Sequence, residues 1–77
     1  MNKQRRKDLE KALELLAQAR EIIECAKDEE EECYDNLPEG IQDSERGEQM
    51  QEYIDTMDEV VSCLEDYESQ IDDIVNG

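Results

Sequence analysis

The stretch "YDNLPEGIQDSERG", Tyr34 to Gly47, lies in the middle of a 77-residue chain and holds its only proline and two of its three glycines. Within it, Leu37-Pro38-Glu39-Gly40 has Pro second and Gly fourth, which is typical of a type I turn. We therefore expect the chain to reverse direction here, with Gly40 as the mirror point of the fold.

Heptad repeats flank this turn on both sides. Apolar residues that recur at positions a and d of a heptad predict helices that pack in a coiled-coil manner. In the first segment, the a and d positions hold Leu9, Ala12, Leu16, Ala19, Ile23, Ala26, Glu30 and Cys33. In the second segment, they hold Gly47, Met50, Ile54, Met57, Val61, Leu64, Glu68, Ile71 and Val75. The pattern predicts an all-α domain over residues 1–77, with helices at about 4–34 and 44–75 and a turn at about 35–43.

An antiparallel two-helix hairpin follows from the same repeats. If facing residues have numbers that add up to 80, Leu16 faces Leu64 and Cys33 faces Gly47 across the seam. In the second helix, Asp43 or Ser44 suits the N-cap position, because a short polar side chain can accept a hydrogen bond from the first turn. The same register places Lys3, Arg5, Arg6 and Lys7 beside Asp72 and Asp73.

The apolar stripe on each helix is wider than one seam requires. The surplus residues are Leu15, Ile22, Tyr53, Val60, Tyr67 and Ile74. A homodimer that forms a four-helix bundle would cover them. The alternative is that this face receives a helix from another protein.

Charge is unevenly distributed along the chain. Residues 1–27 carry seven basic and five acidic residues, whereas residues 28–77 carry one basic and nineteen acidic residues. The predicted acidic surface comprises Glu29, Glu31, Glu32, Asp55, Asp58, Glu59, Glu65 and Asp66. Such a surface attracts basic protein surfaces and repels nucleic acid and anionic membranes. We expect no direct nucleic-acid binding by the acidic body, no membrane association, and a cytoplasmic location with reduced cysteines.

Residue types and motifs argue against catalysis. The chain has no histidine, which removes the usual residue of acid–base catalysis and of zinc sites. The run Asp28–Cys33, "DEEEEC", lacks the central glycine and the alternating ligands of a calcium loop, so a solvated acidic surface is the better interpretation. Cys25 and Cys63 fall on the outer surface, where the sequence leaves their role open. We therefore expect a non-enzymatic protein without cofactor or metal.

Two bulky residues in the turn, Leu37 and Ile41, have two possible uses. They can fold over the last layers of the hairpin as a lid, which would crowd Gly47 and require a small residue there. Alternatively, they can contact a partner protein. We expect the lid.

The segment "NLPEGIQDSERGEQM", followed by an acidic heptad helix, resembles small acidic proteins encoded by phages and prophages of gram-positive gut bacteria. The resemblance rests mainly on residues 34–64 and implies a mobile-element origin, where small acidic proteins often block host proteins. It leads to a first hypothesis, a protein-binding module that covers a basic surface, with mimicry of nucleic acid as its specific form. The alternative is an assembly module that oligomerises as a helical bundle. A third hypothesis is a helical regulator whose basic N-terminal residues bind an anion or nucleic acid.

Overall fold

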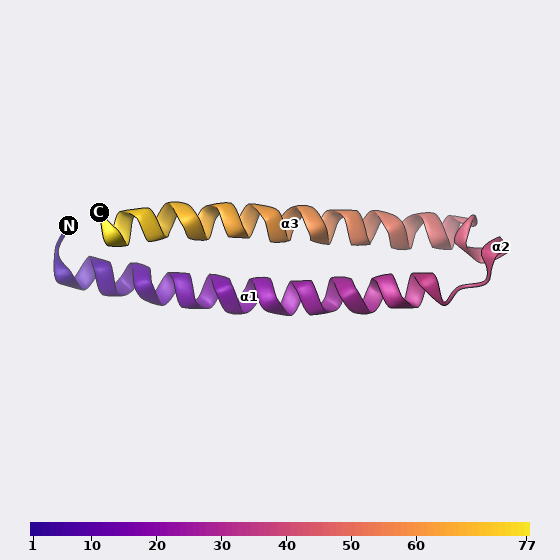
Figure 1. Cartoon of the computed structure of the whole chain (residues 1–77), viewed down its shortest axis with the longest axis horizontal. Coiled ribbons are helices and arrows are strands. Elements are labelled where there is room, and N and C mark those ends of the chain that lie inside the picture. The colour runs from indigo at the N-terminus through magenta and orange to yellow at the C-terminus, as the bar shows by residue number, and fades with distance from the viewer.

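The computed structural model describes all 77 residues and consists of three helices, α1 (Lys3–Asp35), α2 (Glu39–Gln42) and α3 (Glu45–Asn76). The two long helices lie side by side and run in opposite directions, and the short α2 lies at the connecting end (Figure 1). The molecule is a thin rod that measures 58 × 14 × 13 Å. The prediction of an all-α helical hairpin is confirmed.

Both long helices begin at a capping side chain. The backbone N–H of Arg5 donates to Oδ1 of Asn2 at 2.8 Å, and the N–H of Gly47 donates to Oγ of Ser44 at 3.4 Å. These bonds satisfy N–H groups that have no partner within the first helical turn. Ser44, rather than Asp43, is therefore the N-cap of α3. Glu45 and Glu48 follow it in the first turn of α3, where the helix dipole favours negative charge.

The connection between the long helices is not the predicted type I turn. Pro38 has φ −58° and ψ 147°, whereas the second residue of a type I turn requires a ψ of about −30°. Pro38 instead caps α2, and Gly40 lies inside this one-turn helix with nothing within 4 Å of its Cβ position. The side-chain amide of Gln42 donates to the carbonyl oxygen of Tyr34 at 2.9 Å, which ties α2 to the end of α1.

Gly47 is buried at the point where α2 meets α3. A Cβ atom on Gly47 would lie 2.6 Å from both the carbonyl carbon of Gln42 and the carbonyl oxygen of Ile41. Position 47 is therefore crowded, but the crowding atoms belong to the backbone of α2. The expected neighbour Cys33 is exposed instead.

The seam of α3 consists of the predicted a and d residues. Ile54 and Val61 are the most buried apolar residues of the chain, with 5% and 6% of their surface exposed. The other members of this seam are buried or half-buried: Gly47, Met50, Met57, Leu64, Glu68, Ile71 and Val75. The second heptad repeat thus identifies the inner surface of α3 correctly.

The seam of α1 differs from the prediction. Eight half-buried residues spaced alternately by four and three positions line it: Leu9, Leu13, Leu16, Arg20, Ile23, Lys27, Glu30 and Tyr34, of which Leu9, Leu16, Ile23 and Glu30 are the predicted a residues. Ala19, Ala26 and Cys33, which were predicted at d positions, are exposed. The helix is thus rotated so that larger side chains than alanine reach the partner helix, because a longer side chain buries more apolar surface.

The register also differs from the predicted one. Side chains that bridge the two helices join Arg6 to Val75, Arg20 to Glu68 and Lys27 to Asp58, and their residue numbers add up to 81, 88 and 85 rather than 80. Figure 1 shows the same offset, because α3 begins beyond the end of α1. The physical reason is the connection, in which α2 packs against α3 at Gly47 and moves the start of α3 outward.

Candidate protein-interaction surfaces

Six large apolar side chains remain exposed on the two long helices. They are Leu15, Ile22, Tyr53, Val60, Tyr67 and Ile74, with exposed fractions from 39% for Val60 to 70% for Ile22. These are the six residues predicted as the surplus stripe. In a chain with only two buried apolar residues, the hairpin therefore exposes more large apolar side chains than it buries.

All six lie on one side of the hairpin. Each directly precedes a seam residue, as Ile22 precedes Ile23 and Val60 precedes Val61. Successive residues are rotated by about 100° around a helix, so all six are displaced from their seam in the same sense. Because the two helices are antiparallel, the same sense of rotation leads to the same side of the hairpin on α1 and on α3.

This side of the hairpin is also free of charge over most of its length. On α3, eight exposed positions spaced by four and three residues carry no charged side chain: Gln49, Tyr53, Thr56, Val60, Cys63, Tyr67, Gln70 and Ile74. On α1, the positions with this spacing are Ala12, Leu15, Ala19, Ile22 and Ala26. We call the surface formed by Ala12, Leu15, Ala19, Ile22, Ala26, Tyr53, Val60, Tyr67 and Ile74 the apolar face. In a chain with 42% charged residues, a second stripe with heptad spacing and no charge is typical of a helix-packing surface.

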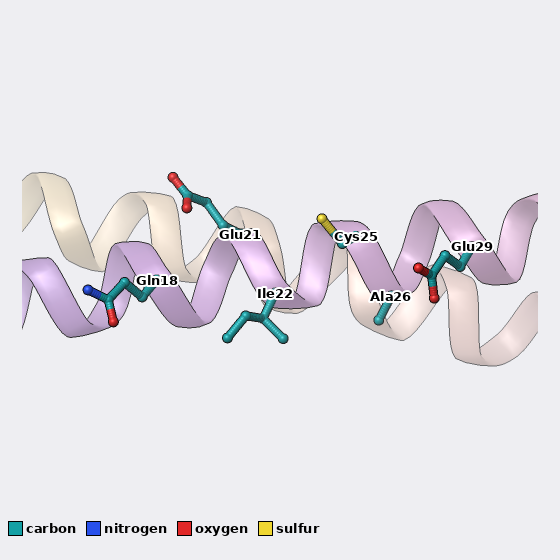
Figure 2. Close-up of a pocket in the computed structure, with 6 residues that line it drawn as sticks. All are labelled: Gln18, Glu21, Ile22, Cys25, Ala26 and Glu29. Atoms are coloured by element: carbon teal, nitrogen blue, oxygen red, sulfur yellow. The ribbon is translucent and has the colours of Figure 1, made fainter.

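The sequence-based assignment missed the alanines of this face. Ala19 and Ala26 were placed in the internal seam but are exposed, whereas Ala12 is half-buried as predicted and lies at the edge of the exposed stripe. A shallow hollow lies on α1 beside Ile22, and Figure 2 shows Ile22 and Ala26 projecting from the same side of the helix. Small side chains next to Ile22 leave room for a residue of a second helix to approach.

The opposite side of the hairpin is closed by ion pairs. Nε of Arg20 donates to Oε2 of Glu68 at 2.8 Å, and Nζ of Lys27 donates to Oδ1 of Asp58 at 3.1 Å. Asp58 directly follows the seam residue Met57, which places it on the side away from the apolar face. The two sides of the hairpin therefore differ in kind, one closed by charge pairs and one apolar.

The pKa values of both bridging cations, Arg20 and Lys27, are raised by their carboxylate partners. The hydrogen bond that Arg20 donates to Glu68 raises the pKa of Arg20, helped by the charges of Glu68, Glu24 and Glu65 and opposed by partial desolvation. The hydrogen bond that Lys27 donates to Asp58 raises the pKa of Lys27 in the same way. Sequence reasoning missed both residues as bridges. The available signal was Glu68, a carboxylate at a seam position that requires a cation from the facing helix.

The second candidate surface is the acidic half of the rod. Residues 21–63, which include the connection, carry 16 acidic and 2 basic residues, a net charge of −14. Residues 1–20 and 64–77, which form the half with both termini, carry 8 acidic and 6 basic residues, a net charge of −2. Folding thus brings the acidic C-terminal segment beside the basic N-terminal segment and concentrates the negative charge at the connecting end.

All eight residues of the predicted acidic surface are exposed. Asp58 is paired with Lys27, and Glu65 and Asp66 lie in the half with both termini. Glu29, Glu31, Glu32, Asp55 and Glu59 lie in the acidic half and form no ion pair. These five carboxylates are available to a partner.

The basic N-terminal residues do not pair with Asp72 and Asp73 as expected. Nη1 of Arg6 donates instead to the carbonyl oxygen of Val75 at 3.3 Å, and no ion pair joins the N-terminal cations to α3. A cation at the last carbonyls of a helix is favourable, because these oxygens have no partner within the helix and carry the negative end of its dipole.

The remaining candidate residues are dispersed. Cys25, Cys33 and Cys63 are exposed free thiols, and no three potential metal ligands lie together. Neither long helix has an apolar stretch long enough to cross a membrane. The chain matches no protein-family model, and comparisons with curated proteins and with solved structures gave no match either.

Proposed function

We propose that the protein is a non-enzymatic protein-binding module whose acidic half covers a basic surface of a partner. The observation that carries this proposal is the net charge of −14 on residues 21–63 against −2 on the rest of the rod. Charge concentrated at one end attracts and orients a basic partner through long-range electrostatics. The resemblance of the turn segment to phage and prophage proteins points to a bacterial host protein as the partner.

Mimicry of nucleic acid is the specific form of this proposal. Duplex DNA carries one negative charge per ~1.7 Å of its axis. The acidic half of the rod likewise presents carboxylates in close succession on two antiparallel helices, and Glu29, Glu31 and Glu32 among them are exposed. A host protein that binds nucleic acid would then recognise these carboxylates in place of phosphates.

Affinity capture from a bacterial lysate at low salt tests the proposal with two charge-matched variants. The first carries Glu29→Gln, Glu31→Gln and Glu32→Gln in the acidic half. The second carries Glu65→Gln, Asp66→Asn and Asp72→Asn in the half with both termini, and therefore has the same net charge. We expect the first variant to lose the captured basic proteins and the second to retain them.

The release of the captured proteins by salt and by competing duplex DNA completes the test. Salt should release the partner, and competition by duplex DNA should release it if the module mimics nucleic acid. Equal retention by both variants would contradict a role for the acidic half. Release by salt without competition by DNA would support a basic partner and contradict mimicry.

The alternative function is an assembly module that forms a homodimeric four-helix bundle. The exposure of six large apolar residues on one side of the hairpin favours it, because such a surface is typical of a protein–protein contact. Sedimentation of Ile22→Glu tests it against Gln51→Glu, which adds the same charge outside the apolar face. We expect a dimer for the wild type and Gln51→Glu, and a monomer for Ile22→Glu. A monomeric wild type would contradict this function.

A further inference from the structure

We infer that the apolar face pairs with a second copy of this chain across a two-fold axis that runs perpendicular to the rod, near Ala19 and Cys63. The inference rests on the proposed dimerisation and adds its geometry. The connecting end of each copy would then lie beside the termini of the other. Each long helix would face its own counterpart, α1 against α1 and α3 against α3, in antiparallel orientation.

Charge selects this orientation over the parallel one. A parallel pair would place two halves of net charge −14 side by side, whereas the transverse axis places each of them beside a half of net charge −2. Repulsion between halves of the same sign is therefore much weaker with the transverse axis.

The charges of α1 are also complementary to a reversed copy of the same helix. Residues 3–11 carry five basic and two acidic residues, and residues 28–35 carry six acidic and no basic residues. In the antiparallel α1 pair, Lys11 of one copy lies near Glu29 of the second copy. This complementarity occurs twice in the dimer, once at each end, and it favours a second copy over an unrelated helix.

The arrangement of the apolar face provides an independent argument. The stripe on α1 runs from Ala12 to Ala26 and has Ala19 at its midpoint, and the stripe on α3 runs from Tyr53 to Ile74 with its midpoint beside Cys63. The bridging contacts between the helices place Ala19 level with residues 62–69 of α3. Both midpoints therefore lie at one level of the rod, as a transverse two-fold axis requires.

The native cysteines allow a direct test on the full chain. All three are exposed, so serine substitutions should preserve the fold. In a Cys25→Ser, Cys33→Ser variant, the remaining Cys63 lies beside Cys63 of the second copy. In the control variant Cys33→Ser, Cys63→Ser, the two Cys25 residues lie about 18 Å apart along the rod, from a rise of ~1.5 Å per residue, beyond the reach of a disulfide.

We expect oxidation to convert most of the Cys63-only variant into a covalent dimer and little of the Cys25-only variant. A dimer in solution whose Cys63 residues do not cross-link would overturn the transverse axis. A cross-link that forms only when the two variants are mixed would also overturn it, because it would join Cys63 of one copy to Cys25 of the other. A monomeric mass for both variants before oxidation would instead overturn the proposed dimerisation itself. Sedimentation before oxidation therefore separates the two failures.

Discussion

Arg20 and Glu68 lie 48 positions apart in the chain, and Nε of Arg20 donates to Oε2 of Glu68 at 2.8 Å between the two long helices. Both side chains are largely covered, with 24% and 16% of their surface exposed. Arg20 also contacts Glu24 at 3.4 Å within its own helix. A seam with only two buried apolar residues thus contains a charge pair that fixes which residues of α1 and α3 face each other.

Removing one partner of this pair should destabilise the hairpin more than removing both. Arg20→Met leaves Glu68 half-buried beside Glu24 and Glu65 without its cation, so we expect a clear fall in the melting temperature. Combined with Glu68→Leu, the same change replaces the pair by apolar contact, which is often neutral or stabilising. Thermal unfolding followed by circular dichroism measures both variants.

The exposed pair between Lys11 and Glu14 provides the control. Its atoms lie 3.7 Å apart and both side chains are more than 60% exposed, so Glu14→Ala should change the stability by only ~0–1 kcal/mol. Equal effects of Glu14→Ala and Arg20→Met would contradict a structural role for the interhelical pair.

The two glycines of the connection should respond to alanine with opposite sign. At Gly47 a Cβ atom would overlap the backbone of Ile41 and Gln42, and such crowding costs about 1–3 kcal/mol. At Gly40, inside α2, the same substitution meets no atom within 4 Å and should stabilise by roughly 0.5–1 kcal/mol, because alanine loses less backbone entropy. Denaturant unfolding of the two variants measures the difference. A stable Gly47→Ala variant would refute the close approach of α2 and α3.

The inner surface of α3 was predictable because its heptad repeat is nearly complete. Ile54, Met57, Val61 and Leu64 occupy consecutive a and d positions, whereas the second stripe on α3 has a large apolar residue only at every seventh position, from Tyr53 to Ile74. On α1, by contrast, alanines and leucines alternate so that two rotations of the helix bury similar numbers of apolar residues. The choice between them depends on Arg20 and Lys27, whose acidic partners lie on α3. Such contacts between distant segments are not visible in a local pattern.

The connection shows the same limit. The sequence predicted the position of the reversal but not its form, because Pro38 fits the first turn of a helix as well as a type I turn. What distinguishes the two is the packing of α2 against Gly47, a contact with the following helix. The six exposed residues of the apolar face could be predicted from the local pattern alone. Each lies next to a seam position and adds an apolar side chain that the seam does not need.

The contact between Lys27 and Asp58 should make the stability of the hairpin fall as the pH rises into the alkaline range. The hydrogen bond to Asp58 raises the pKa of Lys27 above its ordinary value of 10.5. The stabilisation is therefore fully present below about pH 10.5 and is lost as the pH rises through the higher pKa of the folded state. We expect the wild type to melt above Lys27→Met at pH 7 and to lose this advantage above pH 10.5. A difference that stays constant up to pH 12 would contradict the contribution of the ammonium group.

Tyr67 should stabilise the proposed dimer without stabilising the isolated hairpin. It is 54% exposed, so Tyr67→Ala removes little packing within one copy, whereas a covered tyrosine at an interface is worth about 2 kcal/mol or more. We expect roughly thirtyfold weaker self-association and a loss of the concentration dependence of the melting temperature that dimerisation causes. Met1→Ala is the control, since Met1 is 59% exposed outside the apolar face. The same melting temperature for wild type and Tyr67→Ala at every concentration would show that this residue is not covered by a second copy.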